Sequence, residues 1–248
     1  MSIVPSCRSF IIGPMVAVLG RTDPLTRRSP AAMGLAVFDL DRTLVPGSSL
    51  AVFGRELVAS GLVARRDVAR FGLVELAFRR GAAGDSSLER LCRSLLHLAS
   101  GRDYQPLLDV AARVAPGIAS RAYAEGRALV DRHRRAGDLT VLLSAAPHDL
   151  VAAVGAALGF DASVGTAIEI EGGRCTGRLA SVFCYGPGKL ERLRELVADD
   201  DIARAAAYAD SGSDLHLLRR VAKPVAVNPD RRLAAEAVQA GWPRLRFT

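Results

Sequence analysis

The chain has 248 residues, half of them apolar, which is enough for one large domain or for a main domain with a smaller inserted one. Its net charge of +7 comes largely from arginines spread along helical patterns, not clustered with aromatic residues, so we expect no nucleic-acid partner. The four cysteines form no CxxC pair and fit neither a zinc site nor a disulfide framework, which favours a reduced, cytoplasmic location.

Residues 1–33 form the first segment, and we expect a disordered N-terminal extension there. The apolar run Ser9–Gly20 falls well short of the roughly 20 residues that a membrane helix needs, and a Gly-Pro pair interrupts it. We therefore expect no stable membrane anchor. Two alternatives stay open: a secretory signal, because Arg8 precedes the apolar run, or a misassigned start with Met33 as the natural one.

Short, almost wholly apolar runs recur along the chain, and each predicts a strand buried on both faces of a parallel sheet. These runs are Leu35–Leu40, Leu139–Leu143, Ala205–Ala209 and Val225–Val227. Helical patterns lie between and after them, at Pro147–Leu158, Gly188–Val197 and Arg231–Ala240. This alternation predicts an α/β fold, with a doubly wound, Rossmann-like parallel sheet as the core.

Two segments interrupt the alternation. Residues 50–125 contain only helical patterns, whereas a single crossover between parallel strands needs only about a dozen residues. We therefore expect an inserted all-helical cap at 50–125, with the core built from residues 34–49 and 126–248. The stretch Ala167–Ser181 alternates around a Gly-Gly pair and predicts a β-hairpin.

Polar side chains stand where the predicted strands end or where a following helix begins. In chain order they are Asp39, Asp41, Thr43, Ser144, Lys189, Asp210 and Asp214. Ligands of open α/β sheets bind beyond the carboxyl ends of the strands, so we expect these groups to converge on one edge.

A cluster of aspartates this dense does not stay ionised without a cation. Ligand sets made only of oxygen favour a hard ion, and we expect Mg²⁺. The metal would hold one phosphate oxygen, while Thr43, Ser144 and Lys189 could take the others. One aspartate is then free to attack phosphorus, since carboxylates are known covalent carriers.

Four ordered motifs, FDLDRT, VLLSAAP, GPGKLERL and YADSGSDLHLL, resemble those of the haloacid dehalogenase superfamily of phosphatases. The resemblance is closest to its phosphoserine-phosphatase-like branch, subfamily IB with a helical C1 cap, and covers about residues 34–248. It implies a Mg²⁺-dependent phosphoric monoester hydrolase that acts on a small phosphorylated metabolite. Whether the enzyme is a monomer or a homodimer stays open.

The resemblance also implies a role for each motif residue. Asp39 is the nucleophile that forms an aspartyl-phosphate, and Asp41 is the general acid and then the general base. Thr43 positions Asp41, while Ser144 and Lys189 bind the phosphoryl group. The metal site comprises Asp39, Asp41 through its backbone carbonyl, Asp210 and, in support, Asp214.

The substrate is less well defined than the reaction. Phosphoserine phosphatases of this branch carry a glutamate nine residues after the nucleophile, where this chain has Ser48. We take Ser48 and Ser49 as candidate substrate-binding residues. Relatives in the branch act on amino-alcohol phosphates such as histidinol phosphate, on phosphoserine and on phospholipid head groups. A catalytically silent binding protein, a phospho-accepting signalling domain and transfer to an acceptor other than water also remain open.

Overall fold

The computed structural model describes residues 34–66, 69, 92–94 and 96–248, which belong to one structural unit. The predicted extension, residues 1–33, lies outside the described residues. Much of the middle of the predicted helical cap lies outside them as well.

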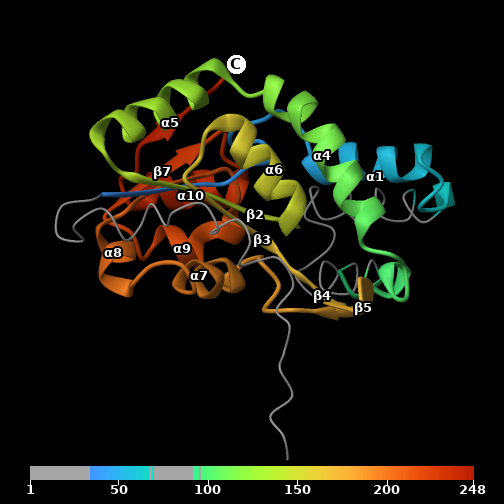
Figure 1. The fold of residues 1–248 in the computed structure, drawn as a ribbon. Helices are drawn as coiled ribbons and strands as arrows, with labels where there is room; N and C mark the ends of the chain where they lie inside the picture. Colours follow the sequence, from blue (N-terminus) through green and yellow to red (C-terminus); the bar gives the residue numbers. More distant parts are fainter. Residues whose placement is uncertain (1–33, 67–68, 70–91, 95) are drawn as a thin grey trace, which may run out of the picture. The chain divides into compact units, whose positions relative to one another are not determined.

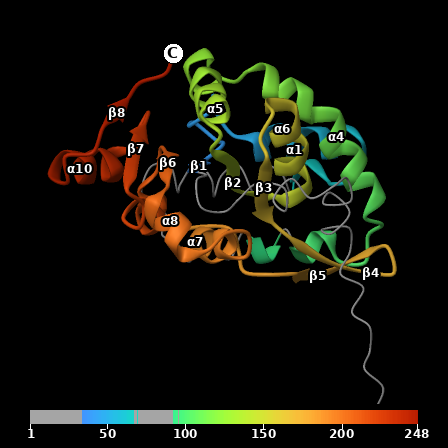
Figure 2. The ribbon, with the colours of Figure 1, turned by 60° about the vertical axis from the view of Figure 1, so that its left-hand side comes forward.

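A six-stranded parallel sheet forms the core. Figure 2 shows its strands in the order β8, β7, β6, β1, β2, β3. The strands are β1 (Leu35–Phe38), β2 (Leu139–Pro147), β3 (Ala162–Thr166), β6 (Ala206–Ala209), β7 (Lys223–Val227) and β8 (Arg244–Leu245). All five pairs of neighbours are parallel. The chain winds outward to β3 on one side of β1 and to β8 on the other, which confirms the doubly wound α/β fold.

Alternate residues of β1 face opposite sides of the sheet, as the geometry of a strand requires. Ala36 and Phe38 belong to one hydrophobic cluster, and Leu35 and Val37 belong to the other. All four side chains are buried, which explains why the run has no polar alternation.

Helices cover both faces of the sheet (Figure 1). The first cluster includes residues of α1 (Ser49–Ala59), α4 (Gln105–Ser120), α5 (Ala124–Ala136) and α6 (His148–Leu158). The second includes residues of α7 (Pro187–Arg194), α8 (Asp199–Arg204), α9 (Leu215–Leu218) and α10 (Arg231–Gln239). Among the described residues, no helix is both long and apolar enough to cross a membrane.

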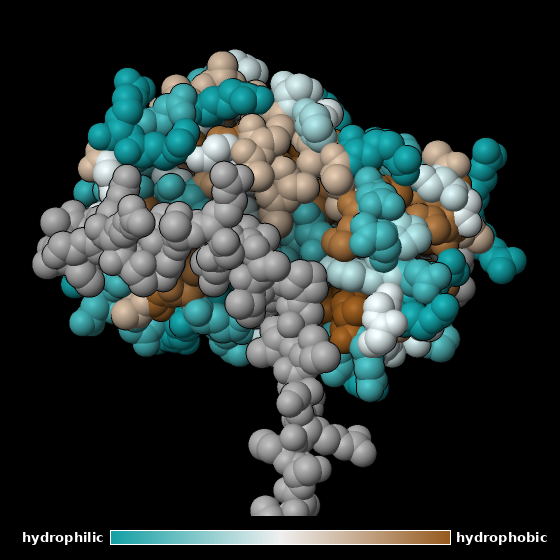
Figure 3. All heavy atoms as spheres, viewed as in Figure 1, coloured by the Kyte–Doolittle hydropathy of each residue, from teal (hydrophilic) through white to brown (hydrophobic). Residues whose placement is uncertain are grey.

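Local signals fix several helix ends. Gly159 ends α6 in a left-handed conformation with φ of 78°, directly after the predicted helical pattern Pro147–Leu158. Asp230 caps α10, because its side chain accepts a hydrogen bond of 2.7 Å from the Leu233 N–H. The arginines of α5 are exposed, so the basic residues of this helix form a solvated face, and Figure 3 shows hydrophilic surface over the helix.

The described parts of residues 50–125 are helices and turns, with one isolated bridge from Asp103 to Arg174. The predicted hairpin is confirmed. Strands β4 (Ile168–Glu171) and β5 (Arg174–Leu179) pair antiparallel, with positive φ at Gly172 and Gly173 in the turn. Helix α4 packs along α6 and α1, and its Val110 is buried in the same cluster as Phe38. The division into cap and core stays a prediction.

Candidate active site

Asp39 and Asp210 follow neighbouring strands at the switch point of the sheet. The Asp39 N–H donates to the Tyr208 carbonyl at 2.9 Å, so the pairing of β1 with β6 extends to the first residue beyond the strand. Asp210 comes directly after β6. The two loops therefore leave the same edge side by side, where ligands of such sheets bind.

Three of the predicted carboxylates form one cluster. Oxygen atoms of Asp39, Asp210 and Asp214 all lie within 4.8 Å of one another. Asp214 reaches the cluster from the 3₁₀ turn Gly212–Asp214, just before α9. The side chains of Asp210 and Asp214 are buried, and the Asp39 side chain is 11% exposed.

Lys189 joins two of these carboxylates. Its Nζ lies 2.6 Å from Asp39 Oδ1 and 2.7 Å from Asp214 Oδ1, and its side chain is buried in the first turn of α7. Burial alone would lower the pKa of Lys189, but the carboxylates of Asp214 and Asp39 outweigh that effect and raise it. The ammonium therefore stays charged throughout the physiological range.

The cationic side chains Lys189 and Arg42 do not fully neutralise the three carboxylates of the acidic cluster. Burial raises the pKa of Asp214 to about 6 against the opposing effect of Lys189. Burial and the charge of Asp39 raise the pKa of Asp210 well above its ordinary value, although Arg42 opposes this with its Nε 2.8 Å from Asp210 Oδ2. A site of buried oxygen ligands with uncompensated negative charge fits a hard divalent cation.

Thr43 contacts the predicted nucleophile. Its Oγ1 donates to Asp39 Oδ2 at 3.1 Å, and the predicted role of Thr43 in positioning Asp41 stays a prediction. Since Lys189 contacts the other oxygen of Asp39, both carboxylate oxygens of Asp39 are held.

Asp41 points toward the start of α1. Its Oδ1 accepts a hydrogen bond of 2.7 Å from the backbone N–H of Ser49. The described acidic cluster does not include the Asp41 side chain. The predicted roles of Asp41, as a metal ligand through its backbone carbonyl and as the group that transfers protons, stay predictions.

The two candidate substrate-binding serines differ in their contacts. Ser48 caps α1, because its side chain accepts from the Ala51 N–H at 3.3 Å. Ser49 is 1% exposed, and its Oγ has no hydrogen-bond partner among the described residues. A buried hydroxyl without a partner is unusual, so Ser49 is the stronger candidate for a ligand contact.

Ser144 lies at the same edge of the sheet, on β2 beside β1. Phe38 pairs with Leu142, so Ser144 stands near the level of Asp39. Ser144 is buried, and its Oγ accepts from the Ala146 N–H at 3.3 Å. Helix α6 begins four residues later, which places its N-terminus beyond the same strand end.

Two contacts of the site were not anticipated from the sequence. Arg42 pairs with Asp210, as described above. Asp230 accepts hydrogen bonds from Gly212 N and Ser211 Oγ and so ties the start of α10 to the loop that carries Asp214. Asp230 directly precedes the predicted helical pattern Arg231–Ala240, where either it or Asn228 could cap the helix, but its contact with this loop depends on the pairing of β6 with β7.

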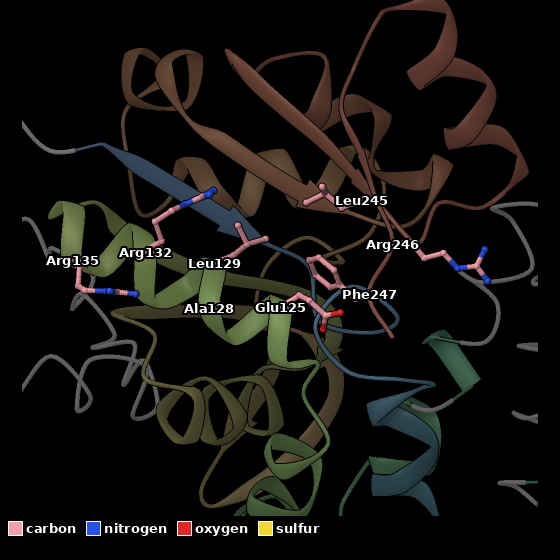
Figure 4. A pocket seen from close by; sticks show the side chains of 8 residues that line it. All are labelled: Glu125, Ala128, Leu129, Arg132, Arg135, Leu245, Arg246 and Phe247. Carbon is pink, nitrogen blue, oxygen red and sulfur yellow. The ribbon is translucent and has the colours of Figure 1, made fainter.

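A separate pocket of about 720 Å³ lies between α5 and the C-terminal segment (Figure 4). No predicted site residue lines it, and the Arg246 side chain points away from Phe247 and Glu125 (Figure 4). The lining residues are Glu125, Ala128, Leu129, Arg132, Arg135, Leu245, Arg246 and Phe247.

Known proteins resemble this chain along most of its length. The model of the haloacid dehalogenase-like hydrolase family matches residues 36–219. The chain is 34% identical over 215 residues to the Inhibition of morphological differentiation protein of Streptomyces azureus, covering 86% of this chain and 78% of that protein. It is 34% identical over 211 residues to a phosphoserine phosphatase of Mycobacterium tuberculosis, covering 84% and 68%.

A third relative and a solved structure extend the comparison. The chain is 31% identical over 226 residues to a histidinol-phosphatase of Neisseria meningitidis, covering 86% of this chain and 98% of that enzyme. A Bordetella pertussis protein described as of unknown function has the same fold, with a TM-score of 0.75, 26% identity and coverage of 86% and 98%. The predicted family and enzyme class, a phosphatase, are confirmed. The chain belongs to the haloacid dehalogenase-like hydrolase family.

Proposed function

We propose that this phosphatase is a Mg²⁺-dependent phosphomonoester hydrolase that works through an aspartyl-phosphate on Asp39. One observation carries the proposal: Lys189 Nζ lies 2.6 Å from Asp39 Oδ1 and 2.7 Å from Asp214 Oδ1, inside a buried acidic cluster at the switch point. A dianionic phosphate is repelled by a bare carboxylate, and a fixed ammonium beside the nucleophile reduces that repulsion.

Asp39 is the nucleophile in this proposal. Lys189 and Thr43 hold one carboxylate oxygen each, which limits rotation of the group and favours in-line attack on phosphorus. Attack forms an O–P bond to Asp39 and breaks the P–O bond to the leaving alcohol. Ser144 and Lys189 would bind the transferring phosphoryl oxygens, together with backbone N–H groups at the start of α6.

Asp41 is the acid and base of the two steps. It would give its proton to the leaving alkoxide and then take a proton from the water that attacks the aspartyl-phosphate. That second attack releases inorganic phosphate and restores the Asp39 carboxylate. The hydrogen bond from the Ser49 N–H holds the Asp41 carboxylate at the start of α1, and the acidic cluster of the described residues does not include this carboxylate.

The donor set fits Mg²⁺. Asp39, Asp210 and the Asp41 backbone carbonyl would hold the ion, and Asp214 would support it. When bound, the ion supplies positive charge for the phosphate oxygens and for the buried carboxylates.

We propose a small phosphorylated metabolite as the substrate, enclosed by a helical cap formed by residues 50–125. An amino-alcohol phosphate such as histidinol phosphate is the first candidate, supported by the relative named histidinol-phosphatase, 98% of whose length the alignment covers. Ser48 stands where phosphoserine phosphatases of the branch carry a glutamate, and its side chain caps α1. Phosphoserine and lipid head-group phosphates are therefore alternatives.

Phosphate release tests this function. The assay compares histidinol phosphate, phosphoserine and the lipid head-group phosphate phosphoethanolamine, with Mg²⁺ and with EDTA, for the wild type and Asp39→Asn. Asp131→Asn, at an exposed position on α5, is the matched control. We expect Mg²⁺-dependent release that Asp39→Asn abolishes and Asp131→Asn retains. Release that persists in Asp39→Asn, or that does not need a divalent cation, would contradict the proposal.

A further inference from the structure

Arg42 stands beside the acidic cluster in a backbone conformation that side-chain-bearing residues seldom adopt. Its φ is 64°, in the left-handed region, and among the described non-glycine residues only Asn228 shares a positive φ. Asparagine tolerates this region better than arginine does, because its short side chain bonds locally. An outlier of this kind persists only where its surroundings impose it.

Hydrogen bonds on both sides impose this conformation on Arg42. Its N–H donates to the Val45 carbonyl at 2.7 Å, and its own carbonyl accepts from Asn228 Nδ2 at 3.3 Å. Glycine would take the same conformation without strain. The backbone conformation therefore does not explain why this residue is an arginine.

The Arg42 side chain pairs with a buried carboxylate. Its Nε lies 2.8 Å from Asp210 Oδ2; the Asp210 side chain is 4% exposed and that of Arg42 is 38% exposed. The guanidinium thus lies on the more exposed side of the pair. It engages one oxygen of a carboxylate that belongs to the three-aspartate cluster.

A guanidinium and a metal ion are alternative partners for such a carboxylate. Mg²⁺ demands oxygen ligands in close octahedral geometry, and a cation nearby adds like-charge repulsion. Lys189 is buried and held by two carboxylates, whereas Arg42 is the more exposed cation of the site and can turn toward solvent. Of the two cations, Arg42 is therefore the one that a metal ion would displace.

We propose that Arg42 is a built-in counter-cation that competes with Mg²⁺ for Asp210 and so weakens the affinity of the site for the metal. The inference rests on the proposed function, because it takes Asp210 as a metal ligand. Its consequence is an enzyme that loads with metal only at higher Mg²⁺ concentration than its carboxylates alone would require.

Metal binding without substrate tests the inference. Isothermal titration with MgCl₂ at fixed ionic strength uses the metal-free full chain, its Arg42→Gln and Arg42→Gly variants, and Arg135→Gln as the charge-matched control. Arg135 is exposed in the last turn of α5, just before β2 begins, and so lies toward the opposite edge of the sheet. We expect Arg42→Gln and Arg42→Gly to bind Mg²⁺ roughly tenfold more tightly than the wild type, and Arg135→Gln to bind as the wild type does.

Unchanged or weaker binding in both Arg42 variants would overturn the inference, and weaker binding would mean that Arg42 supports Asp210 in the loaded site. Asp210→Asn separates this failure from failure of the proposed function. If the wild type binds Mg²⁺ and Asp210→Asn does not, the metal site stands whatever the Arg42 variants do. If neither the wild type nor an Arg42 variant binds Mg²⁺, the metal site and this inference fail together. Thermal unfolding in EDTA checks that each variant is folded.

Discussion

Lys189 Nζ lies 2.6 Å from Asp39 Oδ1, although 150 positions separate the two residues in the sequence. The contact spans the sheet edge from α7 to the loop after β1 and also includes Asp214. It is therefore both a tertiary link and a part of the proposed reaction.

Replacing Lys189 by Met should damage stability and turnover together. The change leaves the carboxylates of Asp39 and Asp214 without their shared cation, at a cost of about 3 kcal/mol in the free energy of unfolding. We expect kcat to fall by about 10³. Urea unfolding at neutral pH and steady-state assays measure the two effects. Lys223→Met, at the only other lysine and exposed on β7, should change neither; equal losses in both variants would argue against a specific role for Lys189.

Thr43 should affect turnover by orienting the carboxylate of Asp39. Thr43→Val removes the hydroxyl that donates to Asp39 Oδ2 while keeping the volume of this fully buried side chain. We expect kcat to fall by about tenfold with little change in KM, because the bond orients the nucleophile and does not bind the substrate. Thr43→Ser keeps the hydroxyl and should restore most of the rate. A change in KM alone would point to substrate binding instead.

Substitutions of Ser48 and of Ser49 should have different effects, the first on stability and the second on substrate binding. Ser48→Ala removes the cap of α1 and should lower the free energy of unfolding by about 1 kcal/mol. Ser49→Ala removes a buried hydroxyl that has no partner among the described residues, so stability should stay constant or rise. If that hydroxyl contacts the substrate, KM should rise several-fold in Ser49→Ala. Unchanged kinetics in Ser49→Ala would remove Ser49 from the candidate substrate contacts.

His148 should make the fold sensitive to mild acid. Burial lowers the pKa of His148 below its ordinary 6.5, with Arg192 adding to the lowering and Asp149 opposing it. As the pH falls through about 6.5, the His148 side chain binds a proton more readily in the unfolded chain than in the folded chain, so its contribution to stability rises with pH across that range. His148→Gln keeps an acceptor for the Gly165 N–H and should lose part of this dependence. Urea midpoints between about pH 5 and 7.5 measure the difference; identical profiles would refute the assignment.

The motifs predicted which residues converge because a doubly wound sheet brings the carboxyl ends of its strands to one edge. The central strands were visible as apolar runs, as in Leu35–Phe38. Strand β3 was missed because only its last three residues are buried, and β8 because it has two residues at the sheet edge.

The residues that form the site were easier to predict from the sequence than the contacts between them. The bond from Thr43 to Asp39 and the pairing of Arg42 with Asp210 depend on side-chain directions in a tight loop after β1. The left-handed φ at Arg42 reverses the chain there, and the spacing of the motif carries no sign of it.

Trapping the covalent intermediate tests the central claim most directly. The protein is mixed with Mg²⁺ and the best phosphomonoester of the panel, quenched in acid and digested, and the peptides are analysed by mass spectrometry. We predict a hydroxylamine-sensitive phosphate on Asp39 in the wild type and none in Asp39→Asn. Phosphate on another residue, or turnover by Asp39→Asn at the wild-type rate, would contradict the account.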